Sequence, residues 1–209
     1  MTTLDALRHD ILIGAFAPGE QLVQETLGER YGVSRVPIRE ALKMLEAEGQ
    51  VEHVPHRGYF VARLSVDELH EVYAMRRLLE AELISNAVPR LSDADIAEIH
   101  QLAQHVRAAR TQDQVASANR AFHFAIFDAA QRPRTTRLVA QLWDSTDPYR
   151  AIYFQSAANR ERVEAEHDLM VQALAARDAH TAIALHNAHR DHSVETVSTI
   201  IRNQGEVHV

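Results

Sequence analysis

Apolar and polar residues alternate with a helical period between Val33 and Gly49. Ser34 suits the N-cap position of this predicted helix, because its hydroxyl can accept a hydrogen bond from a backbone N–H of the first turn. Gly49 suits the left-handed position that ends a helix. The predicted buried stripe repeats every three or four residues and comprises Ile38, Ala41, Leu42 and Leu45. The pattern therefore predicts one amphipathic helix with both of its ends marked.

Shorter elements surround this helix. One predicted helix ends near Gly14, and a second spans residues 21–31 and stops at Gly32. Two runs at residues 51–55 and 59–63 are typical of short strands joined by a tight turn. Three helices followed by a hairpin predict a winged helix-turn-helix.

From Ser65 onwards the helical period continues without a further strand signal. Ser65 itself opens a helix as part of a capping box. The predicted helices cover residues 65–88, 92–111, 113–130, 133 to a break near 147–148, 158–177 and 180–202. About six amphipathic helices with short connections predict an antiparallel all-α bundle. We therefore expect a mostly α protein with two domains, at residues 1–63 and 64–209.

The composition limits what this protein can bind. The chain has 209 residues and a formal net charge of -7, and its first 63 residues are themselves slightly acidic. This balance argues against a general nucleic-acid binder, so any contact with DNA has to be local and made by a few basic side chains. The absence of cysteine excludes disulfides and thiolate metal sites and fits a cytoplasmic protein. No apolar run is long enough for a membrane span.

Basic residues occupy a second face of the helix between Val33 and Gly49. Arg35, Arg39 and Lys43 are spaced four residues apart, so three cations point in one direction. This face suits the major groove of DNA, although a solvated charge stripe on a surface helix would have the same pattern. At the tip of the predicted hairpin, Arg57 is placed to touch a phosphate or the minor groove.

Three segments of this region resemble the N-terminal signature of GntR-type bacterial transcription regulators. They are residues 17–22 (APGEQL), 31–42 (YGVSRVPIREAL) and 46–49 (EAEG). The resemblance implies that Arg35 and Arg39 contact bases or phosphates. It also implies that Ser34 and Arg57 contact the DNA backbone. At Gln50 the family usually has an apolar residue, and we expect glutamine to be tolerated at this helix–strand junction.

A second group of polar residues lies within the predicted bundle. Asn119 and His123 are four residues apart and share one helix face, which neighbouring apolar residues predict to be buried. His167 and His189 are nearly equidistant from the turn expected near residues 177–179, so they would face each other in an antiparallel helix pair. Together with His123 they would form three converging imidazoles, which suit zinc or nickel. Chance alignment is the alternative, because the chain contains 13 histidines.

The predicted bundle resembles the FCD effector domain of FadR-type GntR regulators. The matching segments are residues 73–80 (YAMRRLLE), 119–123 (NRAFH), 166–167 (EH) and His189. The resemblance implies that His123, His167 and His189 hold a divalent metal, which helps to bind a small carboxylate effector. Asn119 would be the fourth ligand, at a position where many relatives have aspartate, and a neutral amide oxygen is a weaker ligand.

The same resemblance gives Arg76 a role. It implies that Arg76 reaches the effector pocket, whereas an ordinary i,i+4 pairing with Glu80 is the alternative. A bundle of about six helices favours the smaller, VanR-like branch of these regulators.

Together these features predict a bacterial DNA-binding transcription regulator, expected to be a repressor and not an enzyme. It would be a homodimer that reads a palindromic operator, with an affinity that the effector shifts. A metal-dependent hydrolase is the alternative, but its only candidate general base, Glu166, projects about 100° away from His167 on the same helix. A metal with a purely structural role is a third possibility.

Overall fold

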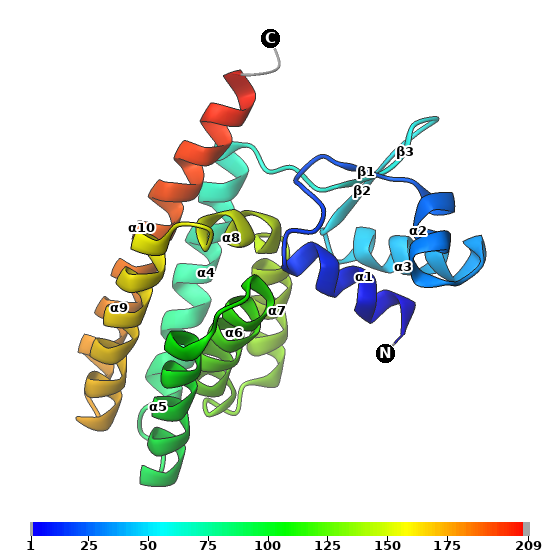
Figure 1. Ribbon diagram of the computed structural model, residues 1–209. Helices are drawn as coiled ribbons and strands as arrows, with labels where there is room; N and C mark the ends of the chain where they lie inside the picture. Colours follow the sequence, from blue (N-terminus) through cyan, green and yellow to red (C-terminus); the bar gives the residue numbers. More distant parts are fainter. Residues whose placement is uncertain (1, 207–209) are drawn as a thin grey trace.

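The computed structural model describes residues 2–206. The N-terminal part contains three helices and a small sheet. Its elements are α1 (Thr3–Leu12), β1 (Gln21–Leu22), α2 (Gln24–Tyr31), α3 (Arg35–Ala47), β2 (Val51–Val54) and β3 (Gly58–Val61). The strands lie in the order β1-β3-β2, and both pairs are antiparallel. The predicted winged helix-turn-helix is confirmed, and it lies to one side of the remaining helices in Figure 1.

Strand β1 departs from the sequence-based prediction. The sequence predicts a helix over residues 21–31, and this prediction is wrong for the first of these residues. Gln21 pairs with Phe60 and Leu22 pairs with Tyr59, so β1 adds a third strand to the wing. Leu22 is buried there, and helix α2 starts only after this strand. A strand of two residues has no recognisable period, so only the pairing with β3 defines it.

Helix α3 has the ends and the buried face that its sequence predicts. Ser34 is the N-cap residue, but its hydroxyl makes no capping hydrogen bond, and the residue is exposed. Gly49 has a φ of 76° and follows the C-cap residue directly. All members of the predicted stripe are buried, namely Ile38, Ala41, Leu42 and Leu45. The opposite face of α3 is therefore available to a partner.

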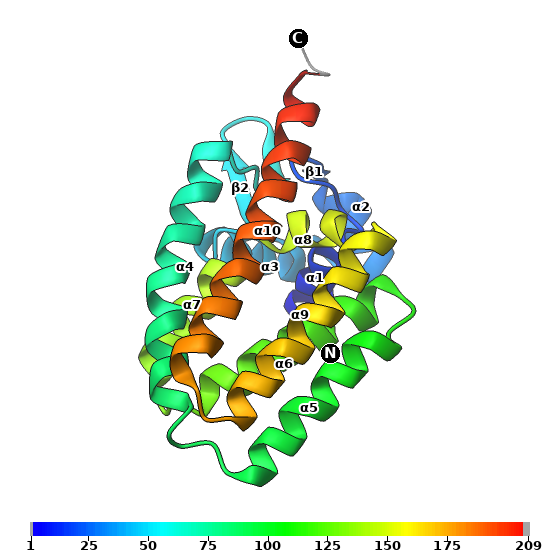
Figure 2. The same ribbon diagram turned by 90° about the vertical axis from the view of Figure 1, so that its left-hand side faces the viewer.

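The helical part contains seven helices among the described residues, whereas the sequence predicts about six. They are α4 (Val66–Ala87), α5 (Asp93–Ala108), α6 (Gln112–Asp128), α7 (Pro133–Asp144), α8 (Asp147–Tyr153), α9 (Ala157–Ala175) and α10 (Ala179–Glu206). The predicted break near residues 147–148 separates α7 from α8 and accounts for the difference. The helix count therefore no longer favours the VanR-like branch. Figure 2 shows α10 running between α4 and α9.

Buried apolar side chains form two separate clusters, one in each part of the chain. The two parts meet where α1 packs on α8. A Cβ on Gly14, just after α1, would lie 2.9 Å from the Cβ of Ala151, so this close approach needs glycine. The backbone N–H of Leu64 donates to the Tyr149 hydroxyl at 2.7 Å. Within residues 2–206, no helix has the length and apolar character that a membrane crossing requires.

Gln50, at the junction between α3 and β2, is only 1% exposed. Neither of its side-chain amide atoms has a hydrogen-bond partner in the described part of the chain. An unpaired buried polar group destabilises a protein by about 1–3 kcal/mol. We therefore expect Gln50→Met, which keeps the length of the side chain, to raise the free energy of unfolding by about 1 kcal/mol.

Urea denaturation followed by circular dichroism measures this effect. Gln101→Met, at an exposed position of α5, is the matched control and should leave the stability unchanged. A lower stability of Gln50→Met would show that the amide is hydrogen-bonded in solution.

Candidate functional site

Three histidines from three helices meet in the core of the helical part. His123 lies on α6, His167 on α9 and His189 on α10, and all three are buried. Each offers a ring nitrogen, and the three nitrogens lie within 4.8 Å of one another. The ring centroids of His167 and His189 are 5.3 Å apart. The convergence predicted from their distances to the α9–α10 turn is therefore confirmed.

The donor atoms of this cluster fit a divalent metal. His123 Nε2 and both ring nitrogens of His167 are buried without a hydrogen-bond partner in the described part of the chain. Asn119 lies one helical turn before His123, and its buried Oδ1 is likewise without a partner there. Two nitrogens of a tetrahedral zinc site are about 3.3 Å apart, so the imidazoles have to move closer together to reach bonding distance. Imidazole nitrogens and an amide oxygen suit zinc or nickel.

A fourth buried histidine, His186, contacts the cluster from outside. Its Nε2 lies 3.0 Å from His123 Nδ1, and its Nδ1 lies 3.0 Å from Arg190 Nη2. A guanidinium group only donates, so His186 accepts at Nδ1 and donates from Nε2. This hydrogen-bond network assigns the proton of neutral His123 to Nε2, whereas a metal ligand has to be free of its proton. Metal binding through His123 Nε2 therefore requires both rings to change tautomer. His186 would then carry its proton on Nδ1 and could donate it to Glu80 Oε2, 3.4 Å away.

The carboxylate of Glu80 is the centre of a buried ion-pair network beside these histidines. It accepts hydrogen bonds from Arg76 Nε (2.8 Å), Trp143 Nε1 (2.7 Å) and Arg190 Nη2 (2.6 Å). Burial alone would raise the pKa of Glu80, but the charges of Arg76 and Arg190 outweigh burial and hold this pKa below its usual range. The i,i+4 pairing of Arg76 is therefore real. It leaves Arg76 Nη1 buried and without a partner among residues 2–206.

Glu166 supports the cluster from the opposite side. Its Oε2 accepts from His189 Nδ1 at 2.6 Å, and its Oε1 lies 2.6 Å from His192 Nδ1. The proton of His189 is therefore on Nδ1, and Nε2 is left for a metal, which is the outer-shell arrangement common in metal sites. Because both carboxylate oxygens are engaged, Glu166 is poorly placed to act as the general base that a hydrolase would need.

A small cavity adjoins the cluster. Arg76, Asn119, His123 and Trp143 are among the residues that line it, and its volume is about 20 Å³. This volume holds one water molecule or one ion. The guanidinium carbon of Arg76 lies 4.4 Å from the centroid of the Trp143 ring, which keeps the arginine at the cavity wall.

The basic residues predicted on α3 all lie on its exposed surface. Arg35 pairs with Glu25 at 2.6 Å. Glu40 lies between the other two, 3.4 Å from Arg39 Nε and 3.3 Å from Lys43 Nζ. Each of these side chains is more than half exposed. Exposed ion pairs contribute little free energy, so phosphates or bases can replace the carboxylates.

The tip of the wing is also exposed. Gln21 Nε2 donates to the backbone oxygen of Arg57 at 2.6 Å, which ties the tip to β1. The guanidinium of Arg57 lies over the ring of Phe60, with 5.3 Å to the centroid. A hollow lined by Gly58 and Arg35, among others, joins the wing to the start of α3. Of the residues predicted to contact DNA, Arg35 therefore lies beside the wing in this hollow.

Sequence reasoning missed the outer residues of the histidine cluster. The sequence pattern gives no role to His186, and it gives Glu80 only the role of a possible partner of Arg76. One signal was present, because His186 lies three residues before His189 and four before Arg190, and these spacings share a helix face. Which face of α10 points into the core depends on how this helix packs against α4 and α9.

These geometries predict a pH-dependent stability. Burial lowers the pKa of His123, His167 and His186 well below the ordinary value of 6.5, because the charged ring would lose its hydration. In the unfolded chain these rings take up protons below about pH 6.5. The contribution of these neutral rings to the free energy of unfolding is therefore complete above about pH 6.5 and is lost as the pH falls below it. The loss amounts to about 1.4 kcal/mol per pH unit for each ring that stays neutral in the fold.

Denaturation of the metal-free protein at a series of pH values measures this slope. His167→Gln should reduce this slope by the contribution of one ring, about 1.4 kcal/mol per pH unit. His105→Gln, at an exposed position, should leave the slope unchanged. Equal slopes in the wild type and in His167→Gln would contradict the assignment of a neutral, buried His167.

Comparison with known proteins agrees with this architecture. The family model for bacterial regulatory proteins of the gntR family matches residues 2–61, and that for the FCD domain matches residues 71–192. The chain is 32% identical over 180 residues to the HTH-type transcriptional regulator McbR of Escherichia coli, covering 82% of this chain and 80% of that one. It is 32% identical over 203 residues to the HTH-type transcriptional repressor GlaR of the same organism, covering 90% and 92%.

A solved structure shows the same arrangement. The structure of E. coli McbR/YncC superposes with a TM-score of 0.81 at 26% sequence identity, and the match covers 97% of this chain and 96% of that one. The two family models and the two relatives therefore lead to one assignment. The chain belongs to the FadR-type bacterial GntR family of DNA-binding transcriptional regulators, which are not enzymes, and its second part is an FCD domain that holds a buried cluster of three histidines.

Proposed function

We propose that this regulator binds a divalent metal at His123, His167, His189 and Asn119 and that a small carboxylate bound beside it controls the affinity for DNA. The observation that carries the proposal is that His123, His167 and His189 bring ring nitrogens within 4.8 Å of one another, and that buried donor atoms of His123, His167 and Asn119 have no hydrogen-bond partner among the described residues. Unpaired buried polar atoms are rare in folded proteins, and a ligand is an ordinary reason for them. A bound zinc or nickel ion would supply a Lewis-acidic positive charge that attracts a carboxylate oxygen.

The class of effector follows from the charge around the cavity. Arg76 Nη1 and the metal would both favour an anion. Arg150 and Arg190 also line this cavity. Glu80 and Asp147, the ion-pair partner of Arg150, offset only part of the positive charge. An arginine binds a carboxylate with paired hydrogen bonds. We therefore propose a small carboxylate in preference to a neutral or cationic effector.

Helix α8 offers a route by which this site can affect DNA binding. On one side, Arg150 and Tyr153 of α8 line the cavity. On the other side, Tyr149 bonds to Leu64 at the junction of the two parts, and Ala151 packs against Gly14. An effector that moves α8 would change how the winged helix-turn-helix sits on the FCD domain. One of the two placements would then match the operator better.

For DNA recognition we propose a homodimer that places two α3 helices in successive major grooves of a palindromic operator. Arg35, Arg39 and Lys43 would contact bases and phosphates, and Arg57 in the wing and Ser34 at the N-terminus of α3 would contact the backbone. We further propose repression as the outcome, in a bacterial cytoplasm. The name of the relative GlaR supports repression, since it is described as a repressor.

The metal is tested by elemental analysis of protein purified without an affinity tag or added metal. We expect about one zinc or nickel ion per chain and its loss in the double variant His123→Ala/His167→Ala, because two of the proposed ligands are removed. The matched control His100→Ala/His105→Ala changes two exposed histidines and should keep the metal. Equal metal contents in the two double variants would contradict the proposed ligands.

Metal removal separates regulation from a structural role. Chelation should lower the melting temperature and also abolish the effect of carboxylates on operator binding. If chelation lowers the melting temperature while the response to carboxylates persists, the metal is structural only.

The DNA-facing assignment is tested by Arg39→Ala. We expect specific operator binding to fall by at least about tenfold, because a bidentate arginine–guanine contact contributes about 1–3 kcal/mol. The dimer should stay intact in light scattering. Arg137→Ala removes the same charge from an exposed position of α7 and should bind as the wild type does. Wild-type affinity of Arg39→Ala in an electrophoretic mobility assay would show that α3 does not read the operator.

A further inference from the structure

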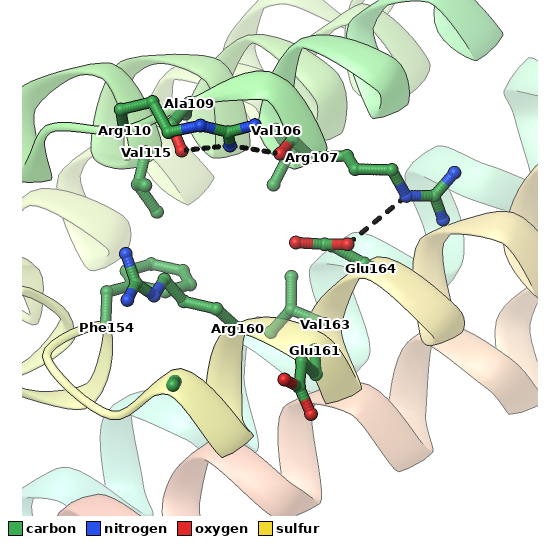
Figure 3. Close-up of a pocket in the computed structure, with 11 residues that line it drawn as sticks. Val106, Arg107, Ala109, Arg110, Val115, Phe154, Arg160, Glu161, Val163 and Glu164 are labelled. Carbon is green, nitrogen blue, oxygen red and sulfur yellow. Dashed lines mark hydrogen bonds and ion pairs between the residues drawn. The ribbon is translucent and has the colours of Figure 1, made fainter.

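A second cavity of the FCD domain, whose lining residues are drawn in Figure 3, shares two lining residues with the small cavity beside the histidines. Its volume is about 250 Å³, and residues from the end of α5, the start of α6, the end of α8 and the start of α9 line it. The apolar part of its wall consists mainly of Val106, Val115, Phe154 and Val163. This volume is close to the lower end of the range for small-molecule sites.

The two cavities share part of their walls. Phe154 and Val163 line both the outer cavity and the small cavity beside His123. Both side chains are almost fully buried, with 6% of Phe154 and 1% of Val163 exposed. The small cavity alone has room for an ion or a water molecule, so a larger effector needs space beyond it. The outer cavity is the adjoining space, and Phe154 and Val163 form the wall that the two cavities share.

Three arginines (Arg107, Arg110 and Arg160) and two glutamates (Glu161 and Glu164) line the outer cavity, so its lining carries one net positive charge, which favours a second anionic group on the ligand. Arg107 is engaged, because it pairs with Glu164 at 3.2 Å and with Asp168 at 2.6 Å. Arg160, which is half-buried, and Arg110 form no ion pair with a carboxylate among the described residues. Figure 3 shows the Arg160 side chain extending along the cavity from α9. A guanidinium held partly out of water and without a carboxylate partner favours a bound anion.

We propose that the effector is a carboxylate with an apolar body and a second acidic group, that is, a dicarboxylate. One carboxylate lies at the histidine cluster, the apolar body fills the outer cavity after the Phe154 ring rotates, and the distal acid pairs with Arg160. This inference rests on the proposed function and extends it, because it makes Arg160 a specificity-determining residue and Phe154 the partition that a ligand displaces.

The test uses the full-length, zinc-loaded protein and isothermal titration with straight-chain monocarboxylates and dicarboxylates of increasing length. We expect dicarboxylates above a minimum length to bind at least about tenfold more tightly than monocarboxylates of equal length, because the second carboxylate adds charge-assisted hydrogen bonds to Arg160. Arg160→Gln should abolish this preference and leave acetate binding unchanged. Arg162→Gln, at an exposed position of the same helix, is the matched control and should keep the preference.

The partition is tested with Phe154→Ala, and with Phe154→Leu in case the alanine variant fails to fold. Either variant should keep its zinc and bind long carboxylates several-fold more tightly, because the ring no longer has to move. Trp143 is the single tryptophan of the chain and lines the small cavity, so its fluorescence reports whether the ligand reaches the inner end.

The outcomes distinguish this inference from the function on which it rests. Acetate binding that needs zinc and His123 supports the proposed function. If acetate binds in this way but dicarboxylates have no advantage, or keep their advantage in Arg160→Gln, the dicarboxylate inference is overturned and the proposed function stands. If neither acetate nor any dicarboxylate binds the zinc-loaded protein, both are overturned.

Discussion

The carboxylate of Glu80 holds α4, α7 and α10 together at the edge of the histidine cluster. A fully buried charge is tolerated only when partners of opposite charge and good geometry surround it, and here Arg76, Arg190 and Trp143 provide them. The dependence is mutual, because the two arginines are themselves buried and need Glu80. Through this network the FCD domain holds positively charged side chains next to a cavity in its core, where they can pair with a bound anion.

Burial has the opposite consequence for the histidines, which stay uncharged, whereas Glu80 stays charged. Burial among one another and near Arg76 keeps His123 and His186 neutral, and a neutral ring can accept either a metal or a hydrogen bond. The chain of hydrogen bonds from Arg190 through His186 to His123 links the tautomer of His123, a proposed metal ligand, to the Glu80 network. Binding of the proposed metal would therefore also affect His186 and Arg190, which are not among its proposed ligands.

Helix α8 connects this chemistry to the DNA-binding part. It is short, it lines the inner cavity with Tyr153, and it contacts α1 and the junction at Leu64 through Tyr149. A short helix that makes contacts on both sides is suited to transmit a change in the cavity. The outer cavity ends at Phe154, the C-cap residue of the same helix, so both cavities border the element that faces the DNA-binding part.

The sequence alone determined the elements that have a strong local signal. Helix α3 was predictable because its stripe, its N-cap and its terminal glycine agree, and the capping boxes at Ser65 and Ser92 mark the starts of α4 and α5. The meeting of His167 with His189 was predictable because a tight turn fixes the register of two antiparallel helices. Tertiary structure alone decided β1, which exists only through its pairing with β3, and the roles of His186 and Glu80. Those roles depend on how each helix is rotated about its axis, and that rotation is set by the packing of the whole core rather than by any local stretch of sequence.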